Sequence, residues 1–256
     1  MRIQGDKGTI VQSVERALNI LECFSKADKE IGVTELAQRL GLKKSTCYGL
    51  INTLYHRGYL DFNESTSKYK LGLKIFEIGQ IFEASLELRE LAKPYLKKLA
   101  EEVKETVHLV IKDDMDAVYV EKVEGPSSFS IISHVGKRAE RHCTAVGKMV
   151  LAHLTDQELE DIRDRNFIKY TDNTITNFNK LKEDIEKIKI KGYSTDNQEV
   201  EIGLRCIAVP VYNHKKDLVG AVSISGPIAR ITEDKMDEYV NKIKGTAKII
   251  TNAIGG

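Results

Sequence analysis

Residues 33–60, VTELAQRLGLKKSTCYGLINTLYHRGYL, carry the pattern that decides the fold of the first part of the chain. Apolar residues recur there at three- and four-residue steps, which predicts one helix capped by Thr34 and a second helix capped by Ser45. Gly41 suits the left-handed position that ends the first helix. Ala37 is small enough for a second helix to pass close by. We therefore predict a helix-turn-helix, two crossed helices joined by a sharp turn.

Flanking segments extend this motif to a winged helix-turn-helix. Before it, apolar residues between Val11 and Phe24 form one face of a predicted helix that ends near Ser25. After it, residues 58–62 and 68–71 alternate in polarity around a turn, which predicts a hairpin. The order helix, helix-turn-helix, hairpin defines a first domain over residues 1–72.

The charge distribution favours nucleic acid as the partner of this domain. The whole chain has a net charge of +1, but residues 1–72 carry 11 basic and 8 acidic side chains. Residues 36–60 contain no acidic side chain. Such a basic stripe is expected on a phosphate-binding surface, although a solvated basic helix or a protein-binding adaptor would also show one.

The second helix of a helix-turn-helix enters the major groove of double-stranded DNA, and its N-terminal residues reach base edges. Lysines mainly contact phosphates, whereas Thr46, Tyr48 and Asn52 are better suited to reading bases. The predicted DNA-binding residues are Thr34, Lys43, Lys44, Ser45, Thr46, Tyr48, Asn52, Lys68 and Lys70.

Residues 73–89 predict a linker helix that is apolar on a wide arc, with Phe76 and Ile78 on different sides. So wide an arc needs two partners, and these could be the winged helix itself and a second subunit. A buried core helix is the alternative. Pro94 then suits the first turn of another helix, over residues 93–104.

Residues 90–256 predict an α+β domain around an antiparallel sheet. Short alternating segments predict strands over residues 106–111, 117–123, 128–135, 193–196, 204–211 and 218–225. Longer periodic segments predict helices over residues 144–154, 156–164, 180–191 and 234–253.

Small polar residues of the second domain suggest a pocket for a small acid. Strand alternation places Ser223 with Ser225, and Cys206 with Ala208, on one face of neighbouring strands. Thr144 opens a helix whose free backbone amides could hold a carboxylate. Ordinary packing is the other explanation of such small residues.

Both domains resemble the IclR family of bacterial transcription regulators. Residues 41–46, GLKKST, and 58–60, GYL, resemble its DNA-binding domain. Residues 192–196, GYSTD, and 223–227, SISGP, resemble its effector-binding domain, which is similar to the GAF fold. One departure is Gly49, where family members commonly carry a basic residue.

The resemblance implies a ligand-responsive regulator that binds operator DNA as a homodimer or tetramer and senses a small organic acid or sugar acid. A repressor is the common case, although the sequence leaves an activator open. The implied effector-binding residues are Ala145, Val146, Asp196, Leu204, Cys206, Ser223 and Ser225.

An enzyme or a metal sensor is the alternative function of the second domain. Residues 146–148, VGK, lack the other residues of a phosphate-binding loop. His142 and Cys143 are neighbours that point to opposite sides of an extended segment, which is poor geometry for a base and its nucleophile. Cys143, Cys206, Asp196 and His142 could bind a metal, but no close-spaced pair among them supports it. We therefore expect no catalytic residue and no cofactor.

The chain is expected to be cytoplasmic. Its longest uncharged stretches run 12 residues, whereas a membrane-spanning helix needs about 17 or more. The first residues show no secretory signal, and the 4 cysteines lie far apart, as expected in a reducing compartment.

Overall fold

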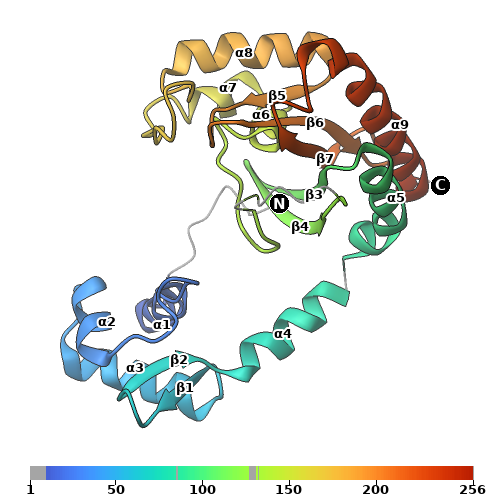
Figure 1. Ribbon diagram of the computed structural model, residues 1–256. Helices are drawn as coiled ribbons and strands as arrows, with labels where there is room; N and C mark the ends of the chain where they lie inside the picture. Colours follow the sequence, from blue (N-terminus) through green and yellow to red (C-terminus); the bar gives the residue numbers. More distant parts are fainter. Residues whose placement is uncertain (1–9, 85, 127–130, 132, 256) are drawn as a thin grey trace. The chain divides into compact units, whose positions relative to one another are not determined.

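The computed structural model describes residues 10–84, 86–126, 131 and 133–255 (Figure 1). The chain divides into two compact units, Met1–Leu86 and Glu87–Gly256. Each unit has its own hydrophobic core.

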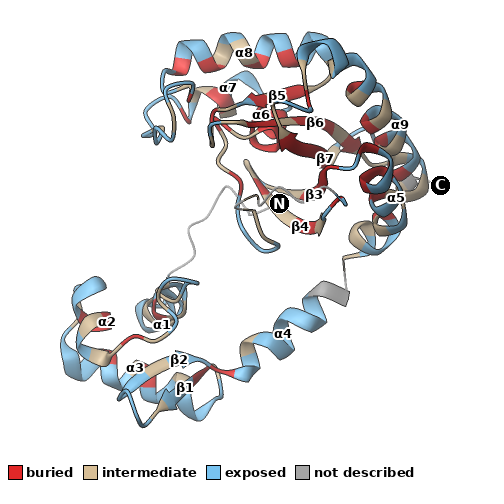
Figure 2. Ribbon diagram, viewed as in Figure 1, coloured by how far each residue is buried: buried red, intermediate tan, exposed pale blue. Residues whose placement is uncertain are grey.

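The first unit is a winged helix-turn-helix. It contains α1 (Gln12–Glu22), α2 (Val33–Arg39), α3 (Lys44–His56), a hairpin of β1 (Leu60–Asn63) with β2 (Lys68–Leu71), and α4 (Leu73–Ala84). The predicted turn is confirmed, since Gly41 has a left-handed φ of 62°. Figure 2 shows the small core as buried segments of these elements. Its fully buried side chains are Ile20, Ile31, Leu36, Ala37, Cys47, Ile51 and Leu60.

The predicted caps of the two helices are each wrong by two positions, since the N-caps are Gly32 and Lys43. Helix α2 begins at Val33 with Gly32 as its N-cap, so Thr34 lies in the first turn. The early start of α2 has a tertiary cause. Ile31 pairs with Tyr69 of β2 in extended conformation, and the helix begins two residues later. Helix α3 begins at Lys44, and Ser45 likewise lies inside it.

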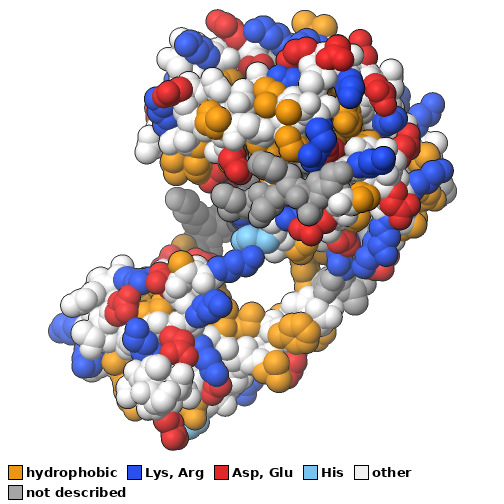
Figure 3. Space-filling view, in the orientation of Figure 1, with side chains coloured by type: hydrophobic (Ala, Val, Ile, Leu, Met, Phe, Trp, Pro, Cys, Tyr) orange, Lys and Arg blue, Asp and Glu red, His pale blue; other side chains and the backbone are white. Residues whose placement is uncertain are grey.

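Helices α1 and α4 leave apolar side chains outside the core. The helix predicted before Ser25 is confirmed, but Val11, Val14 and Leu18 are more than half exposed. On α4, Leu73, Phe76, Ile78, Ile81 and Phe82 are exposed as well, so the alternative of a buried core helix is wrong for this chain alone. Figure 3 shows hydrophobic side chains at the surface over α4.

The second unit is an antiparallel sheet covered on both faces. The sheet order is β4 (Asp116–Val123), β3 (Thr106–Asp113), β7 (Leu218–Pro227), β6 (Leu204–Tyr212), β5 (Ser194–Asn197). Helices α5 (Glu87–Val103) and α9 (Met236–Gly255) pack on one face, and α6 (Ala145–Leu151) packs on the other. Helix α8 (Phe178–Lys191) packs outside α6, while α7 (Asp156–Glu160) and a short 3-10 turn (Glu233–Lys235) complete the unit. The predicted α+β class is confirmed.

Two predicted boundaries are wrong in this region. The linker helix does not continue to residue 89, because α4 ends at Ala84 and α5 begins at Glu87. Pro94 therefore lies inside α5 rather than in its first turn. The longer helix is anchored upstream of Pro94 by the buried Ala92 and by Arg89, whose Nε donates to the carbonyl of Val120 at 2.9 Å.

The strand predicted over residues 128–135 is wrong where it can be assessed. Residues 128–130 and 132 lie outside the described residues, and Ile131 and Ser133 belong to no strand. Their carbonyls accept from Lys122 Nζ, both at 3.3 Å. These carbonyls are therefore directed to a lysine side chain instead of a ladder.

Candidate functional site

The first candidate site is the exposed face of α3. Of the predicted DNA-binding residues, those on and before α3 are all exposed, and so are those of the hairpin. Tyr48 is 55% exposed although it is aromatic, so nothing in the chain's own core explains it. Cys47 and Ile51 take the inward positions of the same helix. The arrangement leaves the polar side of α3 available to a partner.

Two lysines at the start of α3 carry positive charge that no carboxylate of the described residues compensates. Arg39, part of the acid-free stripe, is neutralised by Asp28 at 2.9 Å and by Glu35. In the part of the chain that the structure describes, no carboxylate lies within ion-pair distance of Lys43 or Lys44. The two lysines are therefore available to neutralise phosphates.

The hairpin is held to the segment before α2 by a residue that sequence reasoning missed. Glu30 accepts from Asn63 Nδ2 at 2.7 Å and from Thr66 Oγ1 at 2.8 Å. Both partners belong to the turn region of the hairpin, so this carboxylate positions the wing. The contact spans 33 residues of sequence to Asn63, and no local pattern could have shown it.

The second candidate site is a cavity of about 210 Å³ in the second unit. All seven effector-binding residues predicted from the sequence line it, namely Ala145, Val146, Asp196, Leu204, Cys206, Ser223 and Ser225. Other polar or charged residues in its wall are His108, Tyr119, Ser133, Lys137, Arg138, Glu140, Thr144, Tyr170 and Glu201. The cavity lies between one face of the sheet and the start of α6.

Strand register explains why these residues meet. Asp196 pairs with Cys206, and Cys206 pairs with Ser225, which makes one row across three strands. In the next row on the same face, Ser223 pairs with His108. Residues two apart along a strand share a face, so the two rows form one polar floor. Ser194 Oγ donates to the carbonyl of Ala145 at 2.6 Å and ties α6 to this floor.

Asp196 is a buried carboxylate that forms no ion pair with any of the residues that the structure describes. It is 2% exposed, and its Oδ1 accepts from the backbone N–H of Glu199 at 2.7 Å. Burial raises the pKa of the Asp196 carboxyl to about 7, although that hydrogen bond and the nearby Lys148 work in the other direction. The group can therefore be neutral or charged near neutral pH, depending on what enters the cavity.

His108 is a wall residue that the sequence did not single out. Its Nε2 lies 2.7 Å from Ser133 Oγ, and its ring meets Tyr119 edge-on at 5.2 Å between centroids. Burial, together with the charge of Lys122, lowers the pKa of the imidazole to about 3. The ring is thus neutral, with one nitrogen able to donate and the other able to accept. Only its pairing with Ser223 across β3 and β7 brings it into the site.

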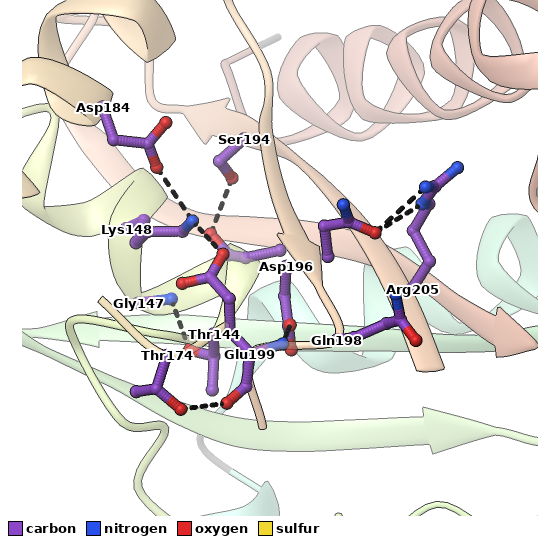
Figure 4. A network of polar contacts seen from close by, with 12 residues as sticks. Thr144, Gly147, Lys148, Thr174, Asp184, Ser194, Asp196, Gln198, Glu199 and Arg205 are labelled. Atoms are coloured by element: carbon purple, nitrogen blue, oxygen red, sulfur yellow. Dashed lines mark hydrogen bonds and ion pairs between the residues drawn. The ribbon is translucent and has the colours of Figure 1, made fainter. Parts of the chain in front are cut away.

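Residues 146–148 do not form a phosphate-binding loop. Lys148 is buried, with its Nζ 2.6 Å from Glu199 Oε1 and 2.8 Å from Asp184 Oδ2 (Figure 4). It cannot reach a phosphate. A Cβ at Gly147 would lie 2.3 Å from the carbonyl oxygen of Glu140, so this glycine permits close packing of α6 on the preceding segment.

Two family models match this chain, one over most of each unit. The model of the IclR helix-turn-helix domain matches residues 13–64, and that of the bacterial transcriptional regulator IclR C-terminal domain matches residues 82–252. The chain belongs to the IclR family. It is an IclR-type DNA-binding transcription regulator, with the helix-turn-helix match on α1 to the hairpin and the C-terminal match on the unit that holds the cavity.

Alignments with similar IclR-family proteins cover nearly the whole chain. The HTH-type transcriptional regulator XynR of Escherichia coli is 34% identical over 247 residues, 96% of this chain and 98% of that protein. The transcriptional repressor IclR of Escherichia coli is 32% identical over 96% of this chain and 91% of that protein. The crystal structure of Thermotoga maritima IclR superposes with a TM-score of 0.72 at 33% identity, over 96% of this chain and 100% of that one.

His142 and Cys143, which the sequence suggested as a base and a nucleophile, have different surroundings in the second unit. The His142 ring stacks on Phe167 and its Nε2 lies 2.9 Å from the carbonyl of Ile168, away from the cavity. Burial raises the pKa of the Cys143 thiol, which disfavours a thiolate nucleophile. No cluster of three or more His, Cys, Asp or Glu side chains in the described ranges could hold a metal ion. Among those residues, no helix is long and apolar enough to cross a bilayer.

Proposed function

We propose that this IclR-family protein is a ligand-responsive repressor whose α3 enters the major groove of its operator. Thr46, Tyr48 and Asn52 read base edges, while the lysines of α3 and the hairpin contact phosphates. The observation that carries the proposal is the exposed, acid-free face of α3 in one unit combined with a polar cavity in the other. The relatives named as repressors support the sign of regulation.

A charge reversal tests the DNA interface. Lys43→Glu with Lys44→Glu should abolish retardation of double-stranded fragments taken from upstream of the protein's own gene. The matched control is Lys97→Glu with Lys98→Glu, an adjacent exposed lysine pair on α5. Equal binding by both double variants would favour a protein-interaction adaptor over a DNA-binding regulator.

The effector that we propose is a small carboxylate. Ser223 and Ser225 offer hydroxyl donors from the sheet, and Ala145 and Val146, which line the same cavity, lie at the start of α6, where free backbone amides could hold a carboxylate. Asp196 in its protonated state would add a donor, and in its charged state it would accept from a ligand hydroxyl. A hydroxylated acid, such as a sugar acid, matches this combination of groups.

We propose that the protein works as a homodimer or a higher oligomer. The exposed apolar residues of α1 and α4 form surfaces that a single chain leaves in water, and contiguous patches of this kind mark protein–protein contacts. Two helix-turn-helix units held together would bind two operator half-sites. The free thiols of all four cysteines fit the reducing cytoplasm as the place where this occurs.

Effector binding would then shift the population of oligomer arrangements that differ in operator affinity. Titration of operator DNA with and without a carboxylate found by thermal-shift screening tests this coupling. Ser223→Ala with Ser225→Ala should weaken the response to effector while the operator affinity of the effector-free protein stays unchanged. Operator affinity that is the same at zero and saturating effector would refute coupling through affinity.

A further inference from the structure

We propose that Lys148 is a positioning residue for effector binding, which acts through Glu199 to fix the place of Asp196 in the cavity. The inference rests on the proposed function in one respect, namely that Asp196 contacts the effector. It concerns a side chain that does not line the cavity and that the proposed function leaves without a role.

Lys148 joins three elements at one ammonium group. It is 1% exposed on α6, and its Nζ bonds to Glu199 in the segment after β5 and to Asp184 on α8. The start of α6 forms one wall of the cavity, and the segment after β5 forms another through Val200 and Glu201. The ion pair with Glu199 therefore sets the distance between two cavity walls.

Glu199 is held at each of its polar ends. Its backbone N–H donates to Asp196 Oδ1 at 2.7 Å, and its carbonyl accepts from Thr174 Oγ1 at 2.6 Å. Its carboxylate oxygen Oε1 accepts a hydrogen bond from Lys148 Nζ at 2.6 Å. The other oxygen, Oε2, is buried without a hydrogen-bond partner among the described residues. Because Lys148 is the cation that compensates this buried carboxylate, removal of the ammonium should release Glu199 and, with it, the hydrogen bond to Asp196.

The electrostatics of Asp196 give the network a signature. The charge of Glu199 raises the pKa of Asp196, and the charge of Lys148 lowers it. Loss of the Glu199 charge by itself should therefore lower the pKa of Asp196, and loss of the Lys148 charge should raise it. The other titratable groups around Asp196 and its cavity are His108 on β3, Tyr119 on β4, Lys137, Arg138, Glu140 and Cys143 ahead of α6, Tyr170 ahead of α8, Glu201 in the segment after β5 and Cys206 on β6.

The experiment compares two carboxyl-to-amide changes at the same ammonium in the full-length protein. Glu199→Gln alters the partner that also bonds to Asp196, whereas Asp184→Asn alters the partner on α8. Amide hydrogen exchange of Glu199 or its replacement, measured without effector, should accelerate about tenfold in Glu199→Gln and by less than about threefold in Asp184→Asn. Equal exchange rates in Glu199→Gln and the unaltered protein would overturn the proposal.

Carboxyl carbon NMR of effector-free protein, with Asp196 assigned by Asp196→Asn, gives the second measurement. The Asp196 midpoint should fall by about one pH unit in Glu199→Gln and rise in Lys148→Met. Lys182→Met, which removes a half-buried lysine of α8 paired with Glu160, should leave the Asp196 midpoint unchanged. An Asp196 midpoint that does not rise in Lys148→Met would contradict the proposal, because this variant loses both the lysine charge and the anchor of the Glu199 hydrogen bond, and each of them lowers the pKa of Asp196. If Lys148→Met does not fold, the comparison of Glu199→Gln with Asp184→Asn decides.

Binding of D-gluconate as a probe carboxylate separates this inference from the proposed function. Glu199→Gln should weaken it about tenfold, and Asp184→Asn by less than about threefold. Failure of the unaltered protein to bind any small carboxylate would refute the effector proposal, whereas the two effector-free measurements would still decide the role of Lys148. Unchanged binding in Glu199→Gln would refute the positioning role.

Discussion

Gly49 is a glycine that the fold does not need, and its replacement by alanine should stabilise the DNA-binding unit. It is the sixth residue of α3, Lys44–His56. A Cβ built at this position meets no atom within 4 Å, and its φ lies outside the left-handed range. Thr53 Oγ1 donates to the Gly49 carbonyl at 3.0 Å, a contact that alanine retains. Nothing in the unit therefore opposes the gain in helix propensity.

The magnitude follows from propensity alone. Alanine is about 1 kcal/mol more favourable than glycine in a helix interior, and about 1 kcal/mol corresponds to roughly a fivefold change in the folded-to-unfolded ratio. Hydrogen exchange of the core amides of α3, such as that of Ile51, should slow by about that factor in the full-length protein. A melting transition assigned to this unit should rise by about 4–8 °C.

The same substitution at Gly147 is the control, because there the sign should reverse. Its Cβ would lie 2.3 Å from the carbonyl oxygen of Glu140 and 2.8 Å from Cα of Arg141, both of which are backbone atoms. Gly147→Ala should therefore destabilise the second unit. Unchanged or faster exchange in α3 of Gly49→Ala would refute the reasoning for Gly49. Operator binding weakened more than about tenfold by Gly49→Ala would show instead that DNA approaches the backbone there.

Three further outcomes follow from the same structure. Phe76→Glu on α4 should shift the sedimentation of the protein toward the monomer and weaken operator binding, whereas an unchanged sedimentation profile would remove α4 from the interface. A bound carboxylate should favour protonated Asp196, so effector affinity should fall as pH rises through about 7, and Asp196→Asn should flatten that dependence in calorimetric titrations. Glu30→Gln should weaken operator binding in retardation assays, because the Glu30 carboxylate holds the β1–β2 hairpin through Asn63 and Thr66. Stronger binding would show instead that the removed negative charge, which repels phosphate, matters more than the position of the hairpin.

Local periodicity predicted the elements of the fold well, and tertiary contacts decided where they begin. Each sheet strand found in the described residues was predicted from alternation to within a few positions, as was the turn at Gly41. The cap of α2 was missed because Ile31 pairs with Tyr69, a contact across 38 positions that no window of sequence contains. In the described part of residues 128–135, the predicted strand is wrong for a similar reason. The carbonyls of Ile131 and Ser133 accept hydrogen bonds from Lys122 Nζ and not from a neighbouring strand.

The candidate cavity shows where sequence reasoning stops. Alternation placed Ser223 with Ser225 correctly, because side chains two apart on a strand share a face whatever the neighbours are. The same rule says nothing about which strand lies beside β7, so His108 was missed although it faces Ser223. Residues 146–148 show the reverse case, in which a local motif suggests a site that the structure does not form. They resemble part of a phosphate-binding loop, yet Gly147 permits close packing and Lys148 forms a buried ion pair. A lysine's function depends on the carboxylates that reach it from elsewhere in the chain, and here those come from positions 36 and 51 residues away.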